Sequence, residues 1–287
     1  MLNRSQLKAL LDAEKIFPSR RLGQSFLVDA NIVRKVVDLC APRLDEHVLE
    51  IGPGLGAITA ALCPRAASVL AVEVDHRLAR LLRTSLPDPR LTVLEADFLD
   101  LAPADLTRAQ VVLGNIPYAI STEIIFKLAE LVHLGQPPRG VFLMLQREVA
   151  DRLSALPSTG AYGVLTLLAS LAFEPVERFA VPPNCFHPRP QVPSVFLHLR
   201  PRLVPLYAPA LREGLTSLVR LLFQQRRKKL STSLRRFLPE TRSLSDLERQ
   251  LGAEVPPGWF DRRPEELPLA DFAQLAAALC ELGIELP

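Results

Sequence analysis

Short apolar runs alternate with longer amphipathic ones between residues 47 and 200, and beyond residue 201 the short runs disappear. The short runs are rich in Val and Leu, and several are almost continuously apolar, which is typical of strands buried on both faces of a sheet. The predicted strands are residues 48–52, 69–74, 91–96, 111–115, 141–145, 175–181 and 194–199.

The segments between the early strands have a helical pattern, such as the leucines at helical spacing in residues 76–86. Strands and helices in alternation predict right-handed βαβ crossovers. We therefore expect an α/β fold of the Rossmann-like kind, with a mainly parallel seven-stranded sheet and helices on both sides. Only a proline-rich loop separates the last two strands, so an antiparallel edge is expected there.

The chain after residue 201 has the pattern of helices interrupted by prolines. We place a domain boundary between Arg200 and Pro205. The predicted organisation is a sheet domain over residues 1–202, with an N-terminal extension over 1–22, and a small all-helical domain over 203–287.

Composition narrows the class of protein only modestly. The 287 residues are 48% hydrophobic and 23% charged, as in a folded protein rather than a disordered one. A formal net charge of +3 is compatible with nucleic-acid binding but does not require it. The four cysteines are far apart, without a CxxC pair, which argues against a zinc site or a disulfide framework. Because no segment resembles a signal peptide or a membrane span, we expect a cytoplasmic protein.

A glycine-rich motif, EIGPGLG at residues 50–56, follows the first predicted strand. Gly52 and Gly54 allow a tight turn and a close approach of a ligand to the backbone, and the amides of the next helix point into the crevice. Gly52, Gly54 and Ala57 also satisfy the dinucleotide-binding pattern. An NAD-dependent oxidoreductase is therefore an alternative, although no catalytic constellation for hydride transfer is found.

Two carboxylates follow at the ends of the second and third predicted strands. Glu73 lies about twenty residues beyond the glycines, where an acid binds ribose hydroxyls. Asp97 is placed to accept a hydrogen bond from an adenine amino group. Together with the glycine turn they favour S-adenosylmethionine, which has no pyrophosphate. The alternative for each acid alone is a helix N-cap.

The segment from Asn115 to Tyr118 follows the fourth predicted strand and matches the needs of adenine methylation. The side chain of Asn115 and the carbonyl of Ile116 can accept hydrogen bonds from an adenine amino group, and these bonds strengthen as the nitrogen becomes tetrahedral. Pro117 fixes the direction of that carbonyl. Tyr118 offers a face on which a base can stack. A plain turn before a helix is the alternative.

With these motifs the chain resembles the ribosomal RNA adenine N6,N6-dimethyltransferases over nearly its whole length. The resemblance is carried by segments that begin at Arg21 (RLGQSFLVDANIV), Leu49 (LEIGPGLGAIT), Ala71 (AVEVD), Glu95 (EADFLD), Gly114 (GNIPYAIST), Leu145 (LQREVADRL), Phe179 (FAVPPNCFHPRPQVPS) and Phe223 (FQQRRKKLSTSL). It implies an enzyme that uses S-adenosylmethionine to place two methyl groups on each of two adjacent adenines near the 3′ end of small-subunit rRNA. The partner would be the immature small ribosomal subunit, and the enzyme a monomer.

The same resemblance implies roles for individual residues. Those that would contact the cofactor are Gln24, Ser25, Leu27, Gly52, Gly54, Glu73, Asp97 and Asn115. Tyr118 and Phe186 would sandwich the target adenine. Arg226, Arg227, Lys228 and Lys229 would help to hold the rRNA from the helical domain. With Arg235 and Arg236 they are predicted to lie on one helix, whose apolar side carries Phe223, Leu230, Leu234 and Phe237; a merely solvated face is the alternative.

Three positions depart from the family pattern: Ser25 and Ala119 where Asn is usual, and Ile116 where Leu is usual. Isoleucine there is familiar from the related large-subunit rRNA methyltransferases that confer macrolide resistance, so that activity is an alternative. The C-terminal match favours the small-subunit branch. A non-catalytic nucleic-acid-binding factor with the same fold is a further alternative, against which the complete glycine motif and the Asn115–Tyr118 segment both argue.

Overall fold

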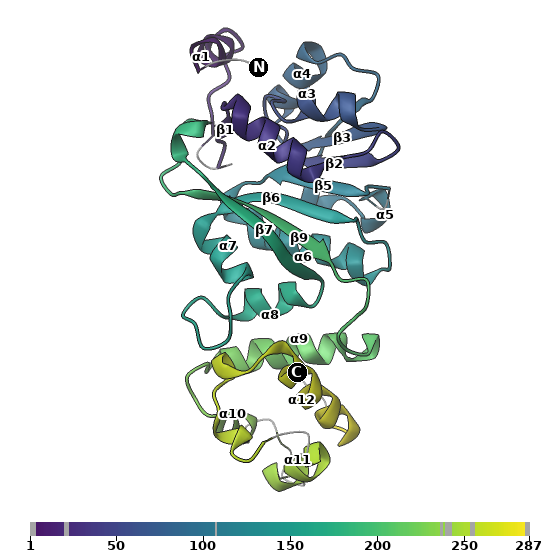
Figure 1. Ribbon diagram of the computed structural model, residues 1–287, viewed down its shortest axis with the longest axis vertical. Coiled ribbons are helices and arrows are strands. Elements are labelled where there is room, and N and C mark those ends of the chain that lie inside the picture. The colour runs from purple at the N-terminus through teal and green to yellow at the C-terminus, as the bar shows by residue number, and fades with distance from the viewer. Residues whose placement is uncertain are drawn as a thin grey trace. The chain divides into compact units, whose positions relative to one another are not determined.

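The computed structural model describes residues 4–19, 23–106, 108–235, 238, 243–252 and 256–284. These residues form two compact units, whose elements are labelled in Figure 1. The first unit takes its described residues from 1–150 and 173–203, and the second from 151–172 and 204–287.

A seven-stranded sheet forms the centre of the first unit. Its strands are β2 (His47–Ile51), β3 (Ser68–Glu73), β4 (Leu91–Glu95), β5 (Val111–Asn115), β6 (Gly140–Gln146), β7 (Phe173–Val181) and β9 (Ser194–Pro201). They lie in the order β4-β3-β2-β5-β6-β9-β7, and only the two pairs that involve β9 are antiparallel. The predicted strands and the mainly parallel sheet are confirmed. The antiparallel strand β9 inserts next to β6, so β7 forms the edge.

Helices cover both faces of this sheet. In chain order they are α2 (Ala30–Cys40), α3 (Thr59–Leu62), α4 (His76–Ser85), α5 (Pro103–Leu106), α6 (Ser121–His133) and the start of α7 (Arg147–Leu153). Helix α1 (Arg4–Ala13) instead packs with Phe26 and with Leu78 and Leu81 of α4. The crossover from β2 to β3 runs toward one edge and that from β5 to β6 toward the other. Because both are right-handed, α3 and α6 lie on opposite faces. The strand order reverses between β2 and β5, which opens a crevice at their carboxyl ends.

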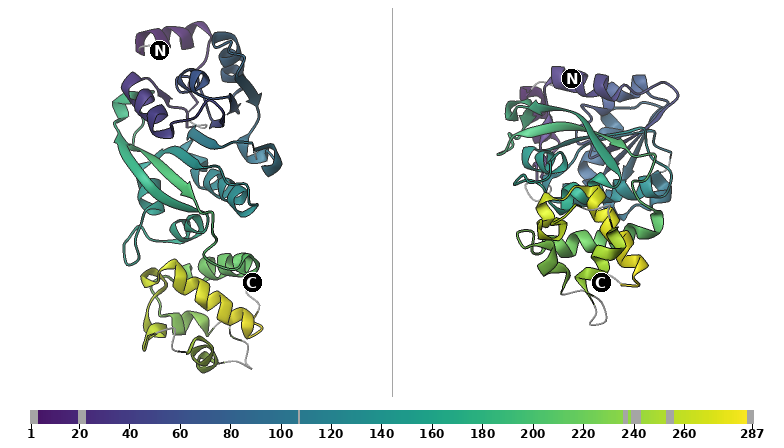
Figure 2. Two further views of the ribbon diagram at one scale, coloured as in Figure 1. Left: turned by 45° about the vertical axis from the view of Figure 1, so that its right-hand side comes forward. Right: turned by 60° about the horizontal axis from the view of Figure 1, so that its bottom comes forward.

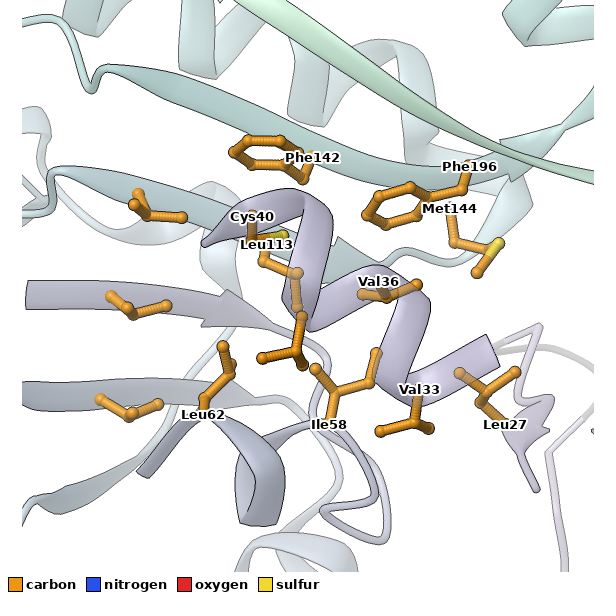
Figure 3. Close-up of a cluster of buried hydrophobic side chains, with 14 of the residues drawn as sticks. Leu27, Val33, Val36, Cys40, Ile58, Leu62, Leu113, Phe142, Met144 and Phe196 are labelled. Carbon is orange, nitrogen blue, oxygen red and sulfur yellow. The ribbon is translucent and has the colours of Figure 1, made fainter. Parts of the chain in front are cut away.

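Helix α2 covers the sheet on the face of α3 (Figure 3). It begins because the Asp29 side chain caps it, with Oδ1 accepting hydrogen bonds from the backbone N–H groups of Asn31 and Ile32 at 2.9 and 3.1 Å. Val33, Val36 and Cys40 point from this helix into the core, which also contains Phe142, Met144 and Phe196 from the sheet. This packing fixes the segment just before α2, which lines the crevice.

A second, two-stranded sheet joins distant segments of the first unit. Strand β1 (Phe26–Leu27) pairs antiparallel with β8 (Phe186–His187). The backbone N–H of Val28 extends the pairing by donating to the carbonyl oxygen of Cys185 at 2.8 Å. The proline-rich loop that carries β8 is thereby held against the segment before α2.

The second unit is helical in its described residues. Its helices are the end of α7, α8 (Val164–Ser170), α9 (Arg212–Phe223), α10 (Leu230–Leu234), α11 (Leu244–Leu251) and α12 (Leu269–Glu281). Helices α9 and α12 pack together, as Figure 2 shows.

Residues 151–172 belong to the second unit, whereas the expected domain division placed them in the sheet domain. Tyr162 explains why they pack with the second unit. Its hydroxyl donates a hydrogen bond to the carbonyl oxygen of Leu267 at 2.7 Å, and its ring centroid lies 6.2 Å from that of Phe223. Helix α8 also packs on α9. The expected boundary at residues 202/203 lies one residue from the observed one at 203/204.

Candidate active site

A cavity of about 230 Å³ opens at the carboxyl ends of β2, β3 and β5, where the strand order reverses. It is lined by all the residues expected to contact the cofactor: Gln24, Ser25, Leu27, Gly52, Gly54, Glu73, Asp97 and Asn115. Pro117 and Ala119 line it as well, whereas Ile116, Tyr118 and Phe186 do not. Segments from five places in the sequence thus meet at one site.

The glycine turn after β2 forms one wall of the cavity. Gly52 and Gly54 both have positive φ angles, of 67° and 58°, which side-chain-bearing residues rarely adopt. A Cβ atom on Gly54 would lie 3.0 Å from the ring of Phe26. The turn is therefore restricted to glycine by both its backbone geometry and the closeness of β1.

Glu73 is held by two backbone groups around this turn. Its Oε2 accepts a hydrogen bond from Gly54 N–H and its Oε1 one from Asp75 N–H, both at 3.0 Å. Burial raises the pKa of Glu73, although these hydrogen bonds oppose the shift. Glu73 is not a helix N-cap, because Asp75 caps α4. Its carboxylate is fixed at the cavity wall, as an acceptor for ribose hydroxyls requires.

Asp97 does serve as an N-cap, which was the alternative for this residue. Its Oδ1 accepts a hydrogen bond from Leu99 N–H at 2.9 Å at the start of a single 3₁₀ turn, Phe98–Asp100. The half-buried side chain also lines the cavity. The cap orients the carboxylate through Oδ1 and leaves Oδ2 outside that hydrogen bond.

The side chain of Asn115 has a defined orientation. Its Nδ2 donates a hydrogen bond to the backbone carbonyl of Ser25 at 2.8 Å. A carbonyl can only accept, so this contact settles which end of the amide is nitrogen. Oδ1 is thereby left as the acceptor end of a side chain that lines the cavity, and an acceptor is what an adenine amino group needs.

The hydroxyl of Ser25 also makes a hydrogen bond within the protein. It donates to the carbonyl oxygen of Pro188 at 2.8 Å, in the loop that carries β8. The departure from the usual asparagine therefore gives this position a hydrogen bond within the protein.

Tyr118 follows Pro117 and begins a 3₁₀ turn, Tyr118–Ile120, which leads into α6. Its half-buried ring is fixed by a hydrogen bond of 2.6 Å between its hydroxyl and that of Ser194. Burial raises the pKa of Tyr118, so the hydroxyl stays protonated at neutral pH. Ile116, in contrast, is a core residue, with 2% of its surface exposed.

The structure does not bring Phe186 to the cavity as a stacking partner. The side chain is 1% exposed and belongs to the core cluster that also contains Leu27 and Phe196. The reason is the pairing of β1 with β8, in which Leu27 and Phe186 are partners. In this structure Phe186 supports the segment that contains Ser25 and Leu27.

Glu50 is a site residue to which the sequence motif gave no role. It lines the cavity with 2% of its surface exposed, and its Oε2 has no hydrogen-bond partner among the described residues. Burial raises its pKa to about 7, and the charge of Glu73 adds to the shift. The Thr59 hydroxyl opposes this shift. A buried carboxylate oxygen without a hydrogen-bond partner is costly unless a cation or donor reaches it. An acid directly before the glycine turn, at the end of a buried strand, was the available signal.

The four basic residues 226–229 lie in the second unit. They were predicted to lie on one helix, and this prediction is wrong. Helix α9 ends at Phe223 and α10 begins at Leu230, with a turn between them. Arg226 pairs with Glu265 at 2.8 Å and Lys229 with Asp261 at 2.9 Å. Arg227 and Lys228 are exposed, and no ion pair of either is found in the part of the chain that the structure describes. Arg236 and Phe237 lie outside the described residues.

The sheet order, the glycine turn and the acids at the ends of β3 and β4 define an S-adenosylmethionine-dependent methyltransferase of the Rossmann-like class. The described residues contain no cluster of His, Cys, Asp or Glu that would hold a metal ion. No described helix is long and apolar enough to cross a membrane.

Comparison with known proteins gives the family. The model of the family "Ribosomal RNA adenine dimethylase" matches residues 18–255. Ribosomal RNA small subunit methyltransferase A of Nitrosospira multiformis is 40% identical over 222 residues, which are 77% of this chain and 84% of that protein. The protein of the same name from Geobacillus thermodenitrificans is 38% identical over 273 residues, 92% of this chain and 91% of that one. The chain belongs to the ribosomal RNA adenine dimethylase family.

Solved structures agree with this assignment. A dimethyladenosine transferase from Plasmodium falciparum has the same fold, with a TM-score of 0.76 at 24% identity over 91% of this chain and all of that one. The 23S rRNA methyltransferase ErmE gives a TM-score of 0.65 at 30% identity over 89% of this chain and 99% of that one. The expectation of an S-adenosylmethionine-dependent rRNA adenine dimethyltransferase is confirmed, and the oxidoreductase alternative is set aside.

Proposed function

We propose that this enzyme dimethylates the N6 amino groups of two adjacent adenines near the 3′ end of small-subunit rRNA. The names of the most similar relatives support the small-subunit substrate. The observation that carries the chemistry is the orientation of Asn115, whose Nδ2 is held by the Ser25 carbonyl while Oδ1 remains as the acceptor. The immature subunit would be the partner, and the enzyme would act as a monomer in the cytoplasm.

The residues around the cavity fit S-adenosylmethionine. Glu73 would hold its ribose and Asp97 its adenine amino group. Glu50 supplies a buried carboxylate whose Oε2 has no hydrogen-bond partner among the described residues, which suits the positive charge of the methionine part. When bound, the cofactor supplies a methyl group on a positively charged sulfur, which a nitrogen nucleophile can displace in line.

Asn115 and the Ile116 carbonyl would act on the adenine amino group. Its lone pair is delocalised into the ring, so the nitrogen is a poor nucleophile. Two acceptors bind its protons most strongly when the nitrogen becomes tetrahedral, which stabilises the transition state over the ground state. Tyr118 would stack on the base and hold it in line. The amine proton leaves after transfer, so the residues need not include a general base.

The raised pKa of Glu50 predicts that ionisation of this side chain favours cofactor binding but lowers the stability of the fold. Cofactor binding should require the ionised carboxylate, so the affinity is expected to fall by up to about tenfold per pH unit below pH 7. Glu50→Gln should remove most of this dependence. The same variant should be more stable than the wild type at pH 8, because one pKa unit is about 1.4 kcal/mol and a rise from 4.5 to about 7 costs on the order of 3 kcal/mol.

The difference in stability between Glu50→Gln and the wild type should build up as the pH rises from 4.5 to 7. It should vanish below pH 4.5, because Glu50 is then protonated in both the folded and the unfolded state. Calorimetric titration with the cofactor from pH 5.5 to 7 and thermal unfolding from below pH 4.5 to pH 8 are the measurements. Glu248→Gln, at an exposed site on α11, is the matched control. An unchanged pH profile of cofactor affinity in Glu50→Gln would remove Glu50 from the cofactor site.

Arg227 and Lys228 are proposed as the main phosphate contacts of the second unit. Replacing both by alanine should reduce the slope of log affinity for rRNA against log salt by roughly two units. Arg226→Ala with Lys229→Ala should change the slope less, because Glu265 and Asp261 already neutralise these side chains. Filter binding at several salt concentrations measures both slopes. Equal slopes for the wild type and the Arg227/Lys228 variant would leave this segment as a solvated turn.

The likeness to ErmE makes large-subunit rRNA the second candidate substrate. The purified enzyme should be incubated with labelled cofactor and, separately, with unmodified small-subunit particles and with protein-free 23S rRNA. Label on the small-subunit particle supports the proposal. Label on the 23S rRNA alone would replace it with the alternative.

A further inference from the structure

We propose that Gln24 is a positioning residue for Asn115, acting through the Ser25 carbonyl, rather than a direct contact of the cofactor. This inference rests on the proposed role of Asn115. It departs from the role that the family resemblance implies for Gln24. Its basis is a set of hydrogen bonds that runs from the N-cap of α4, through residues 23–25, to the side chain of Asn115.

Both ends of the Gln24 amide are bonded within the protein. Its Nε2 donates to Oδ2 of Asp75 at 3.0 Å, and its Oε1 accepts from the backbone N–H of Ser19 at 2.7 Å. The backbone N–H of Gln24 donates in return to the carbonyl oxygen of Ser19 at 3.1 Å. A backbone N–H can only donate, so the orientation of this amide is fixed as firmly as that of Asn115.

Asp75 is a rigid anchor for Gln24. It is 5% exposed, caps α4 through the backbone N–H of Arg77 at 3.0 Å, and pairs with the guanidinium of Arg77 at 2.7 Å. The hydrogen bonds from Arg77 and Gln24 hold its pKa below the ordinary range, so it is ionised throughout the working pH range. Its own N–H donates to Glu73, which connects the same anchor to the cofactor wall.

Residues 23–25 are held between this anchor and the catalytic segment. On one side Gln24 bonds to Asp75, and on the other the Ser25 carbonyl accepts from Asn115. Gly23, with a φ of 60°, brings the backbone so close that a Cβ there would lie 3.6 Å from Pro117 Cβ and from Tyr118 N. A shift of Gln24 therefore moves the carbonyl that orients Asn115, while the contacts from β2 and β3 to the cofactor stay in place.

An exchange of the two side chains tests the proposal. Gln24→Glu places a second carboxylate against Asp75, and Asp75→Asn leaves two amides in contact; each single variant should lower kcat at saturating cofactor by tenfold or more. The double variant Gln24→Glu/Asp75→Asn restores one donor and one acceptor between the two side chains with the same total charge, and asparagine also caps helices well. It should recover part of the wild-type kcat, because Asp75→Asn also removes Oδ2 as an acceptor for the Arg77 guanidinium. Gln136→Glu, at an exposed turn after α6, is the matched control.

The contrast between kcat and cofactor affinity separates this role from a direct contact. The structure predicts a fall in kcat larger than the rise in cofactor Kd for Gln24→Glu. A raised Kd with wild-type kcat at saturation, or a double variant no faster than the slower single one, would overturn it. Should Gln24→Glu fail to fold, Gln24→Met removes both hydrogen bonds without adding charge and is judged by the same kcat and Kd criteria. The kcat and the cofactor Kd of each variant are compared with those of the wild type on whichever rRNA the wild type methylates. A wrong substrate assignment would therefore not affect this test.

Discussion

Asn115→Ala is expected to slow methyl transfer by on the order of a hundredfold or more while the affinity for rRNA changes little. The variant removes the acceptor Oδ1, which matters most when the adenine nitrogen becomes tetrahedral. It also releases the Ser25 carbonyl, which has Asn115 Nδ2 as its partner. The proposed phosphate and stacking contacts, which would dominate RNA affinity, are left unchanged by this substitution.

The measurement is a single-turnover assay with labelled cofactor on an unmodified small-subunit particle, together with an rRNA-binding titration. Asn31→Ala, at an exposed position on α2, is the matched control and should behave as the wild type. Transfer by Asn115→Ala at nearly the wild-type rate would exclude the proposed role of this side chain. A loss of rRNA affinity equal to the loss of rate would instead make Asn115 a ground-state contact.

Tyr118→Ala should weaken the productive binding of the adenine as well as the rate. Stacking on an aromatic ring contributes about 1–3 kcal/mol per base, which corresponds to a loss of roughly 5- to 150-fold in kcat/KM. Tyr118→Phe keeps the ring and removes only the hydrogen bond to Ser194, so its loss should be much smaller.

Steady-state kinetics of both variants on the same particle test this difference. Equal losses in Tyr118→Phe and Tyr118→Ala would show that the hydroxyl, and not the ring face, carries the contribution of Tyr118.

Because Phe186 is buried in this structure, Phe186→Ala should lower the thermal stability of the first unit, as removal of a buried aromatic side chain typically does.

The sheet was predictable because its strands carry strong local signals. Val48, Val111 and Val141 begin short, almost continuously apolar runs, which are typical of central strands buried on both faces. The positions of Glu73, Asp97 and Asn115 in one cavity follow from the same prediction, because the carboxyl ends of parallel strands share one edge of the sheet.

Features that depend on long-range packing were not predictable from the pattern. Strands β1 and β8 have two residues each, too short for any periodicity, so neither their pairing nor the burial of Phe186 could be foreseen. The turn at residues 224–229 has a helical pattern in the sequence, but ion pairs to Glu265 and Asp261 hold it. The packing of residues 151–172 on α9 depends on Tyr162, which carries no such signal in the sequence.

The most direct test of the proposed activity is to identify the product nucleoside and its position. Small-subunit particles without the modification would be incubated with the purified protein and S-adenosylmethionine, and the rRNA digested and analysed by mass spectrometry with site mapping. The proposal predicts N6,N6-dimethyladenosine at two adjacent positions near the 3′ end of the small-subunit rRNA, with N6-monomethyladenosine as an intermediate at low enzyme concentration. Methyl groups on cytosine, guanine or protein, or none at all, would contradict it.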